Sequence, residues 1–170
     1  AFSYFRSFDL PVKIARPFNT YGPRQSSRAI IPTIITQVLE GKGELRIGNT
    51  SPTRDLTYVT DTCRAIIDIA KQSKFVGDVV NIGTNSEISI QELITKIEKI
   101  SGRKVKTVQD NERVRPKKSE VDRLISSNEK ILSKTNWKPE ISLEEGLTKT
   151  FEWFEKIDIR SLYKPDRYNV

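Results

Sequence analysis

The fold prediction depends most on the stretch Val12-Lys-Ile-Ala-Arg-Pro-Phe-Asn-Thr-Tyr-Gly-Pro23. In its first half, apolar and polar residues alternate from Val12 to Arg16, and Pro17 follows. This pattern is typical of a short strand. The run from Phe18 to Pro23 is predicted to be a loop at the end of that strand. Because loops at strand ends carry the sites of α/β proteins, we expect functional residues here.

Alternating helix and strand signals surround this stretch. Asp61 is predicted to cap a helix with Ile66, Ile67 and Ala70 on one face, and Ser89 and Ser142 each begin a capping box. We expect helices at 1–8, 30–39, 61–70, 90–100 and 143–154, and strands at 12–16, 43–47, 57–59 and 79–82. This alternation predicts an α/β architecture with a parallel sheet.

The composition is that of one ordinary globular domain. The 170 residues include 29 Lys and Arg against 22 Asp and Glu, which gives a net charge of +7. No stretch approaches the roughly 20 apolar residues of a membrane helix, and no cleavable leader opens the chain. We therefore expect a cytoplasmic protein that does not enter a membrane.

Two absences exclude whole classes of chemistry. The sequence has no His, which removes Ser-His and Cys-His nucleophiles and histidine-ligated metals, so we expect no metal site. Its single Cys, Cys63, cannot form an internal disulfide, which agrees with a reducing compartment. We expect Cys63 to be a small buried hydrophobic residue.

The positive charge is spread thinly along the chain. Nucleic-acid binders carry a dense basic face, so we expect no nucleic-acid partner. Single loop arginines such as Arg54 and Arg115 suit a diphosphate clamp, because a guanidinium binds phosphate oxygens in pairs. The alternative is that both form ordinary surface ion pairs.

Four segments together resemble one known family. They are Arg16-Pro-Phe-Asn-Thr-Tyr-Gly-Pro23, Arg54-Asp-Leu-Thr-Tyr-Val59, Val80-Asn-Ile-Gly83 and Arg113-Val-Arg-Pro116. In order and spacing they resemble the extended short-chain dehydrogenase/reductase family, specifically its NAD-dependent sugar-nucleotide epimerases and dehydratases. The resemblance implies the last strands of a Rossmann-type parallel sheet plus a small α/β substrate-binding domain. Segments 1–28 and 75–88 would belong to the sheet, and segments 29–74 and 89–170 to the substrate domain.

Two motifs of that family do not occur in the sequence. Its eight glycines never fall as G-x-G-x-x-G, and no Tyr is followed four residues later by Lys. The chain also begins at Ala1 and contains no Met. We therefore expect a C-terminal half that is catalytically inactive alone. The resemblance implies that the intact enzyme is a homodimer and binds NAD mostly through the other half.

The resemblance also implies a role for individual residues. Asn19 would hold the substrate's diphosphate, and Arg54 and Arg115 would each bind a phosphate. Pro17 and Phe18 would line the nicotinamide end of the cofactor site. The residues implied near the nucleobase are all aliphatic: Ile30, Ile31, Leu45 and Ile47.

The reaction favoured by the resemblance is 4,6-dehydration of a nucleotide-linked hexose or N-acetylhexosamine. Hydride would pass from C4 to NAD, water would leave across C5 and C6, and hydride would return to C6. A UDP-hexose 4-epimerase is the main enzymatic alternative, and decarboxylating relatives are also possible. From another class, the chain could be a stand-alone, non-catalytic sugar-nucleotide-binding module.

Overall fold

The computed structural model describes residues 1–113 and 121–163. Seven α-helices are described: α1 (Phe2–Phe8), α2 (Ile30–Glu40), α3 (Val59–Lys71), α4 (Ile90–Ser101), α5 (Glu129–Lys134), α6 (Leu143–Glu155) and α7 (Ile159–Leu162). The described strands are β1 (Ile14–Pro17), β2 (Asn19–Tyr21), β3 (Glu44–Ile47), β4 (Thr53–Arg54), β5 (Leu56–Tyr58), β6 (Val79–Ile82), β7 (Ile88–Ser89), β8 (Lys106–Gln109) and β9 (Arg123–Leu124).

The strands pair mostly in parallel, as the alternating pattern predicts. Three parallel pairs form, β1 with β6, β2 with β5 and β3 with β8, and β4 lies between antiparallel β7 and parallel β9. The register of the first pair sets Ile14 beside Val79, and that of the second sets Asn19 beside Leu56. The predicted α/β class is confirmed.

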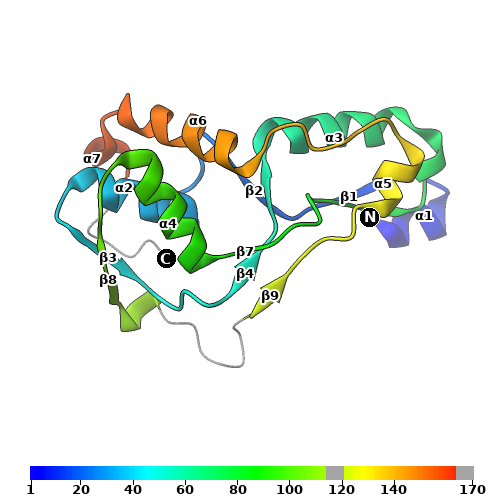
Figure 1. The fold of residues 1–170 in the computed structure, drawn as a ribbon. Coiled ribbons are helices and arrows are strands. Elements are labelled where there is room, and N and C mark those ends of the chain that lie inside the picture. The colour runs from blue at the N-terminus through cyan, green and yellow to red at the C-terminus, as the bar shows by residue number, and fades with distance from the viewer. Residues whose placement is uncertain (114–120, 164–170) are drawn as a thin grey trace.

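Two hydrophobic clusters hold the elements together. The larger lies among α2, α4, α6 and the strands beside them, and Leu45, Leu93 and Phe154 in it are fully buried. The smaller joins α3, α5 and β6 through Ala65, Val80 and Ile131. Figure 1 shows these two groups at opposite ends of the molecule, with β4, β7 and β9 crossing between them.

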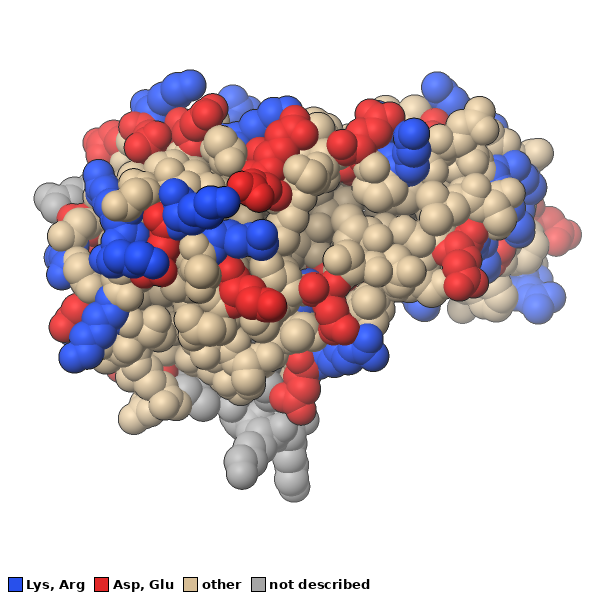
Figure 2. All heavy atoms as spheres, viewed as in Figure 1, with Lys and Arg blue, Asp and Glu red and all other residues tan. Residues whose placement is uncertain are grey.

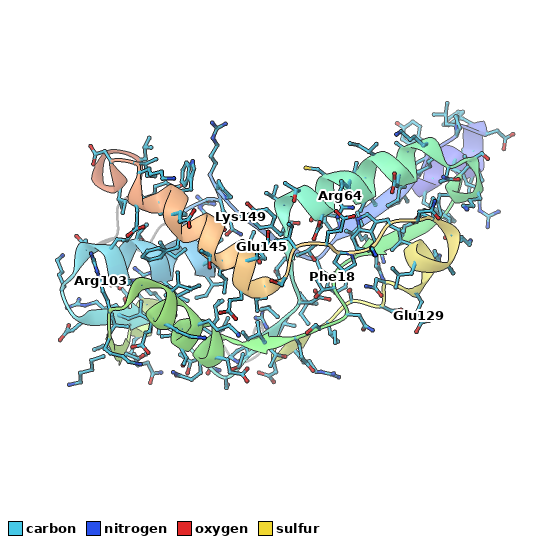
Figure 3. The ribbon with its side chains drawn as sticks, turned by 45° about the horizontal axis from the view of Figure 1, so that its top comes forward. Phe18, Arg64, Arg103, Glu129, Glu145 and Lys149 are labelled. Atoms are coloured by element: carbon cyan, nitrogen blue, oxygen red, sulfur yellow. The ribbon has the colours of Figure 1, made fainter. Side chains whose placement is uncertain are left out.

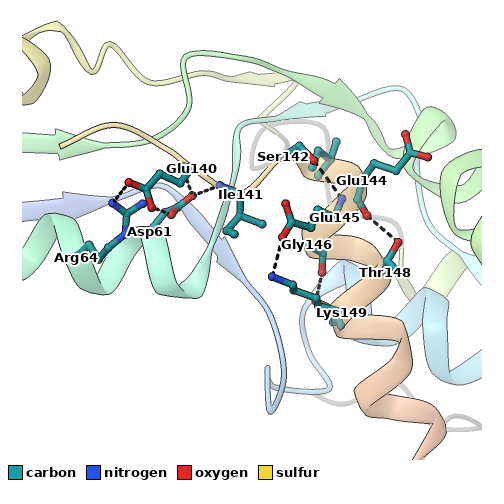
Figure 4. A network of polar contacts seen from close by, with 12 residues as sticks. Asp61, Arg64, Glu140, Ile141, Ser142, Glu144, Glu145, Gly146, Thr148 and Lys149 are labelled. Carbon is teal, nitrogen blue, oxygen red and sulfur yellow. Dashed lines mark hydrogen bonds and ion pairs between the residues drawn. The ribbon is translucent and has the colours of Figure 1, made fainter.

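Local end signals place the three long helices of the larger cluster. Gly41 ends α2 in the left-handed conformation with φ 75°, which glycine adopts without strain. The hydroxyl of Ser89 accepts from the N–H of Glu92, whose carboxylate accepts from the N–H of Ser89, so the predicted capping box starts α4. The hydroxyl of Ser142 accepts from the N–H of Glu145 at the start of α6, but the carboxylate of Glu145 pairs with Lys149 (Figure 4), so this second predicted capping box is only half formed.

The expectations for α3 were wrong in three respects. The helix begins at Val59 after Tyr58, so Asp61 is not its cap but a residue of the first turn that is 1% exposed. Ile66 and Ile67 are exposed rather than buried, and so is Cys63. Ile66, Ile67 and Ala70 do share a face, as their spacing predicts, but that face is exposed. The buried side of the helix carries Asp61, Thr62, Ala65 and Ile69.

The run from Phe18 to Pro23 is also not simply a loop. Its residues Asn19–Tyr21 form β2, because the parallel edge of β5 pairs with them. Strands β8 and β9 and helix α5 lie between residues 103 and 138, where no element was expected. Their partners are distant in sequence, so no local pattern marks them.

The surface mixes both charges. Figure 2 shows Lys and Arg interspersed with Asp and Glu over the face in view. Among the described residues, no helix has both the length and the apolar character that crossing a membrane requires.

Gly146, in the second turn of α6, gives a test of the packing. A Cβ at this position would lie 2.1 Å from Oη of Tyr21 and 2.9 Å from Cδ2 of Tyr58. Alanine gains about 1 kcal/mol of helix propensity, but overpacking a core costs roughly 1–3 kcal/mol, and Tyr21 is too buried to move aside. We expect Gly146→Ala to lower the free energy of unfolding by about 1–2 kcal/mol, measured by urea denaturation. Thr148→Ala, on the same helix, is the control; a stabilised Gly146→Ala variant would contradict this packing.

Candidate functional site

The pairing of β2 with β5 brings two of the quoted segments side by side. In the register of this pair, Asn19 lies beside Leu56. Leu56 directly follows Asp55 in the sequence. The Nδ2 of Asn19 donates to the backbone carbonyl of Asp55 at 3.5 Å. The amide expected to hold a diphosphate is therefore fixed to the segment that carries Arg54.

Arg54 ends the short strand β4 and is held by main-chain carbonyls. Its Nη1 donates to the carbonyl of Thr53 at 2.8 Å and to the carbonyl of Val121 at 2.7 Å. Strands β7 and β9 flank β4 on its two sides. The position of the guanidinium thus depends on three strands from distant parts of the sequence.

A cavity of about 350 Å³ brings most of the predicted binding residues together. Asn19 and Arg54 line it, and so do the aliphatic residues Ile30, Ile31 and Ile47. We call this the basic cavity. Its complete lining in the described residues is Asn19, Gln25, Arg28, Ala29, Ile30, Ile31, Thr33, Ile47, Gly48, Asn49, Pro52, Arg54, Leu56, Ile90, Arg113, Val121 and Leu124.

The other predicted site residues lie elsewhere. Leu45 is 0% exposed on β3 and does not line the basic cavity, although Ile47 on the same face of the strand does. Pro17 and Phe18 lie at the end of β1, outside the cavity. Arg115 falls outside the described residues, so its role stays a prediction.

Sequence reasoning missed several residues that line the cavity. Arg113 reaches it from a short 3-10 turn, with Nε donating to Oδ2 of Asp110 at 3.1 Å. Gln25 lines it too, and its Nε2 donates to the carbonyl of Thr20 at 2.8 Å. Arg28 precedes α2. The resemblance singled out Arg115 in the segment Arg113-Val-Arg-Pro116, and no signal in the sequence indicates that Arg113 lines the cavity.

The lining of the basic cavity combines positive charge with an apolar surface. Arg28, Arg54 and Arg113 line the cavity, and its described lining contains neither Asp nor Glu. Guanidinium groups bind phosphate oxygens through paired hydrogen bonds. The aliphatic residues Ile30, Ile31 and Ile47 offer a wall for a flat, weakly polar ring.

A larger hollow, of about 800 Å³, has the opposite charge. It lies between α4 and the segment before α6, and Glu87, Glu92 and Glu140 line it together with one Lys. An ion pair with Arg123 and a hydrogen bond from Thr53 hold the pKa of Glu87 below its ordinary value. A carboxylate that stays ionised repels a diphosphate, so the smaller basic cavity suits that ligand better.

Pro17 and Phe18, which the resemblance places near NAD, lie at the end of β1. The N–H of Phe18 donates to the carbonyl of Ile82 at 2.8 Å, which ties the end of β1 to β6 near the middle of the molecule in Figure 3. A dinucleotide site also needs a glycine-rich turn between a strand and a helix, and the glycine spacing of this sequence does not provide one. Pro17 and Phe18 alone do not make a dinucleotide site. Among the described residues, no three His, Cys, Asp or Glu side chains gather as a metal site would require.

The chain matches a family model and curated relatives. Residues 1–150 match the family described as GDP-mannose 4,6 dehydratase. The chain is 35% identical over 154 residues to the UDP-N-acetyl-alpha-D-glucosaminuronate decarboxylase of Bacillus cytotoxicus, covering 88% of this chain and 48% of that protein. It is 31% identical to human dTDP-D-glucose 4,6-dehydratase over 157 residues, 91% of this chain and 44% of that protein. The chain thus spans about half the length of these relatives.

Solved structures agree. The UDP-glucuronic acid 4-epimerase of Bacillus cereus, solved with UDP-glucuronic acid and NAD, has a TM-score of 0.83 and 31% identity, covering 91% of this chain and 48% of that one. The dTDP-glucose 4,6-dehydratase of Bacillus anthracis, solved with NAD, has a TM-score of 0.82 and 32% identity, covering 98% of this chain and 51% of that one. Together with the motifs and the fold, these matches show that the chain belongs to the extended short-chain dehydrogenase/reductase family of NAD-dependent sugar-nucleotide dehydratases and epimerases.

Proposed function

We propose that this chain binds the nucleotide diphosphate of a nucleotide sugar in the basic cavity, as the substrate-binding part of an NAD-dependent 4,6-dehydratase. The observation that carries the proposal is the lining itself, in which Arg28, Arg54 and Arg113 lie around one cavity with Asn19 and no described carboxylate. Several donors approaching a diphosphate from different directions neutralise it without a metal. The nucleobase would pack against Ile30, Ile31 and Ile47.

Each residue has a defined task in this proposal. The guanidinium of Arg54 binds phosphate oxygens, and the Asn19 amide donates a hydrogen bond to the same diphosphate. Arg113, another arginine of the lining, adds positive charge. Arg115 remains the second phosphate-binding arginine that the family resemblance implies. Pro17 and Phe18 would border the nicotinamide when NAD is bound, and NAD would supply the oxidation at C4 of the sugar.

The choice of 4,6-dehydratase rests on the family model and on the relatives of that activity. An epimerase is the second candidate, favoured by the structural match to a UDP-glucuronic acid 4-epimerase. Since the chain lacks Tyr-x-x-x-Lys, we expect it to be inactive alone under either reaction. Turnover of a nucleotide sugar by this chain with NAD would contradict that expectation.

Isothermal titration with UDP, dTDP and GDP tests the binding proposal. We expect at least one nucleoside diphosphate to bind, and the matching monophosphate to bind more weakly because it presents less charge to the arginines. Asn19→Ala should weaken binding by about tenfold, the lower end of what one hydrogen bond to a charged group contributes. Equal affinity for the mono- and diphosphate, or no binding of any of the three, would contradict the proposal.

A further inference from the structure

Asp55 is a fully buried carboxylate beside the basic cavity. It stands between Arg54 and Leu56, which both line the cavity, and is 0% exposed. Its Oδ1 accepts from the N–H and hydroxyl of Thr84 at 2.9 and 2.7 Å. Its Oδ2 accepts from the N–H of Asn85 at 3.0 Å and from the N–H and hydroxyl of Ser126 at 3.1 and 2.6 Å. These five donors are all neutral.

The backbone around the carboxylate is shaped to receive it. Asn85 has φ 57°, a left-handed conformation that turns successive N–H groups toward one point. A Cβ on Gly83 would lie 2.1 Å from Oγ of Ser126 and 2.8 Å from Oδ2 of Asp55. The loop after β6 therefore closes around Asp55 only because residue 83 has no side chain.

Asp55 connects the segments that hold Asn19 and Arg54, the two proposed ligand contacts. Its backbone carbonyl accepts from Nδ2 of Asn19, and its N–H donates to the carbonyl of Leu124 at 2.8 Å. The carbonyl that accepts from Arg54 belongs to Val121, in the same segment. The carboxylate thus joins the start of β5, the loop after β6 and residues 121–126 at one point.

We propose that Asp55 is a positioning residue for nucleotide-diphosphate binding, whose carboxylate fixes the Asn19 amide and the Arg54 guanidinium in the geometry that the ligand needs. The inference rests on the proposed function. Asp55 does not touch the ligand, and it acts through the two residues that do. A binding constellation holds its geometry only when the groups behind it are themselves locked by packing and hydrogen bonds.

Asp55→Asn tests this with little change in volume. Each carboxylate oxygen accepts from at least one backbone N–H, so the new NH₂ group must face an N–H whichever way the amide turns. We expect the Kd for UDP to rise about tenfold or more, with dTDP and GDP titrated in parallel. Binding is measured below the unfolding temperature of each variant.

Asp61→Asn is the matched control. Asp61 is also a buried aspartate that connects distant segments, with Oδ2 accepting from the N–H groups of Glu140 and Ile141 at 3.1 Å each (Figure 4). Asp61 does not line the basic cavity. We expect this variant to lose stability while its Kd for UDP stays within about twofold of wild type. Equal increases in Kd for the two variants would mean that Asp55 is merely structural and would overturn the inference.

A double mutant distinguishes a positioning role of Asp55 from an unspecific loss of structural order in the variant. If Asp55 acts partly through Asn19, the loss caused by Asp55→Asn should be smaller in an Asn19→Ala background than in wild type. Fully additive losses contradict the inference. If Asp55→Asn does not fold, Thr84→Val removes a single donor, and Thr84→Ser restores it; the first should weaken binding and the second should recover it.

The outcomes also separate this inference from the proposed function. Wild-type chain that binds none of the three nucleoside diphosphates contradicts the proposed function. Wild-type chain that binds, together with an Asp55→Asn variant of unchanged Kd, contradicts only the role of Asp55.

Discussion

Replacing Arg54 by Ala is expected to raise the Kd for the preferred nucleoside diphosphate by about 10- to 100-fold. Hydrogen bonds to charged groups contribute about 1.5–3 kcal/mol, and each 1.4 kcal/mol is tenfold in affinity. Among the described residues, Arg54 is the arginine predicted to bind phosphate that lines the basic cavity. Isothermal titration of wild type and variant gives the ratio directly.

The Arg54 side chain also binds the carbonyl of Val121, so a structural contribution must be separated. Arg54→Lys keeps the charge but loses the paired geometry of the guanidinium, and we expect a loss between those of wild type and Arg54→Ala. Arg103→Ala is the matched control, because Nη1 of Arg103 binds the carbonyls of Val38 and Leu39 at the end of α2, outside the cavity (Figure 3). Unchanged affinity of Arg54→Ala, or an equal loss with Arg103→Ala, would contradict the assignment.

Asp61→Ala is expected to destabilise the fold by roughly 2–4 kcal/mol, because two part-buried N–H groups lose their acceptor. Those N–H groups belong to Glu140 and Ile141, and Arg64 also donates to Asp61 at 2.5 Å (Figure 4). The ion pair raises the pKa of Arg64, but Arg64 is partly exposed, so solvent compensates much of that loss. The lost N–H partners therefore account for most of the effect.

Thermal unfolding followed by circular dichroism measures this change, with a fall in Tm of about 5–10 °C expected for a chain of this size. Arg64→Ala removes the ion pair and leaves the N–H groups of Glu140 and Ile141 bonded, so it should cost much less. If Arg64→Ala and Asp61→Ala were equally destabilising, the ion pair and not the loop attachment would hold α3 to this segment.

Local signals account for the parts of the fold that the sequence predicts. Gly41, Ser89 and Ser142 mark helix ends within a few residues of the groups they satisfy, and each does so in the structure. Asp61 shows the limit of such a signal. Its carboxylate caps nothing in its own helix and instead binds a segment about 80 residues away.

Long-range pairing decided what the sequence could not show. The loop expected at Asn19 is a strand because β5 pairs with it. Asp55 connects several segments because Thr84 and Ser126, which are distant in sequence, donate hydrogen bonds to its carboxylate. For the site, the residue types in the sequence indicated which side chains could bind a nucleotide diphosphate, but not which of them reach the cavity. Ile47 and Leu45 share one face of β3, yet only Ile47 reaches the basic cavity.

The most direct test of the account is a crystal structure of this chain with UDP bound. The account predicts the diphosphate in the basic cavity, with phosphate oxygens within hydrogen-bonding distance of the Arg54 guanidinium and the Asn19 amide, and the uracil against Ile30, Ile31 or Ile47. A diphosphate bound in the acidic hollow beside Glu87 and Glu140, or bound in the basic cavity without contact to Arg54 and Asn19, would contradict it.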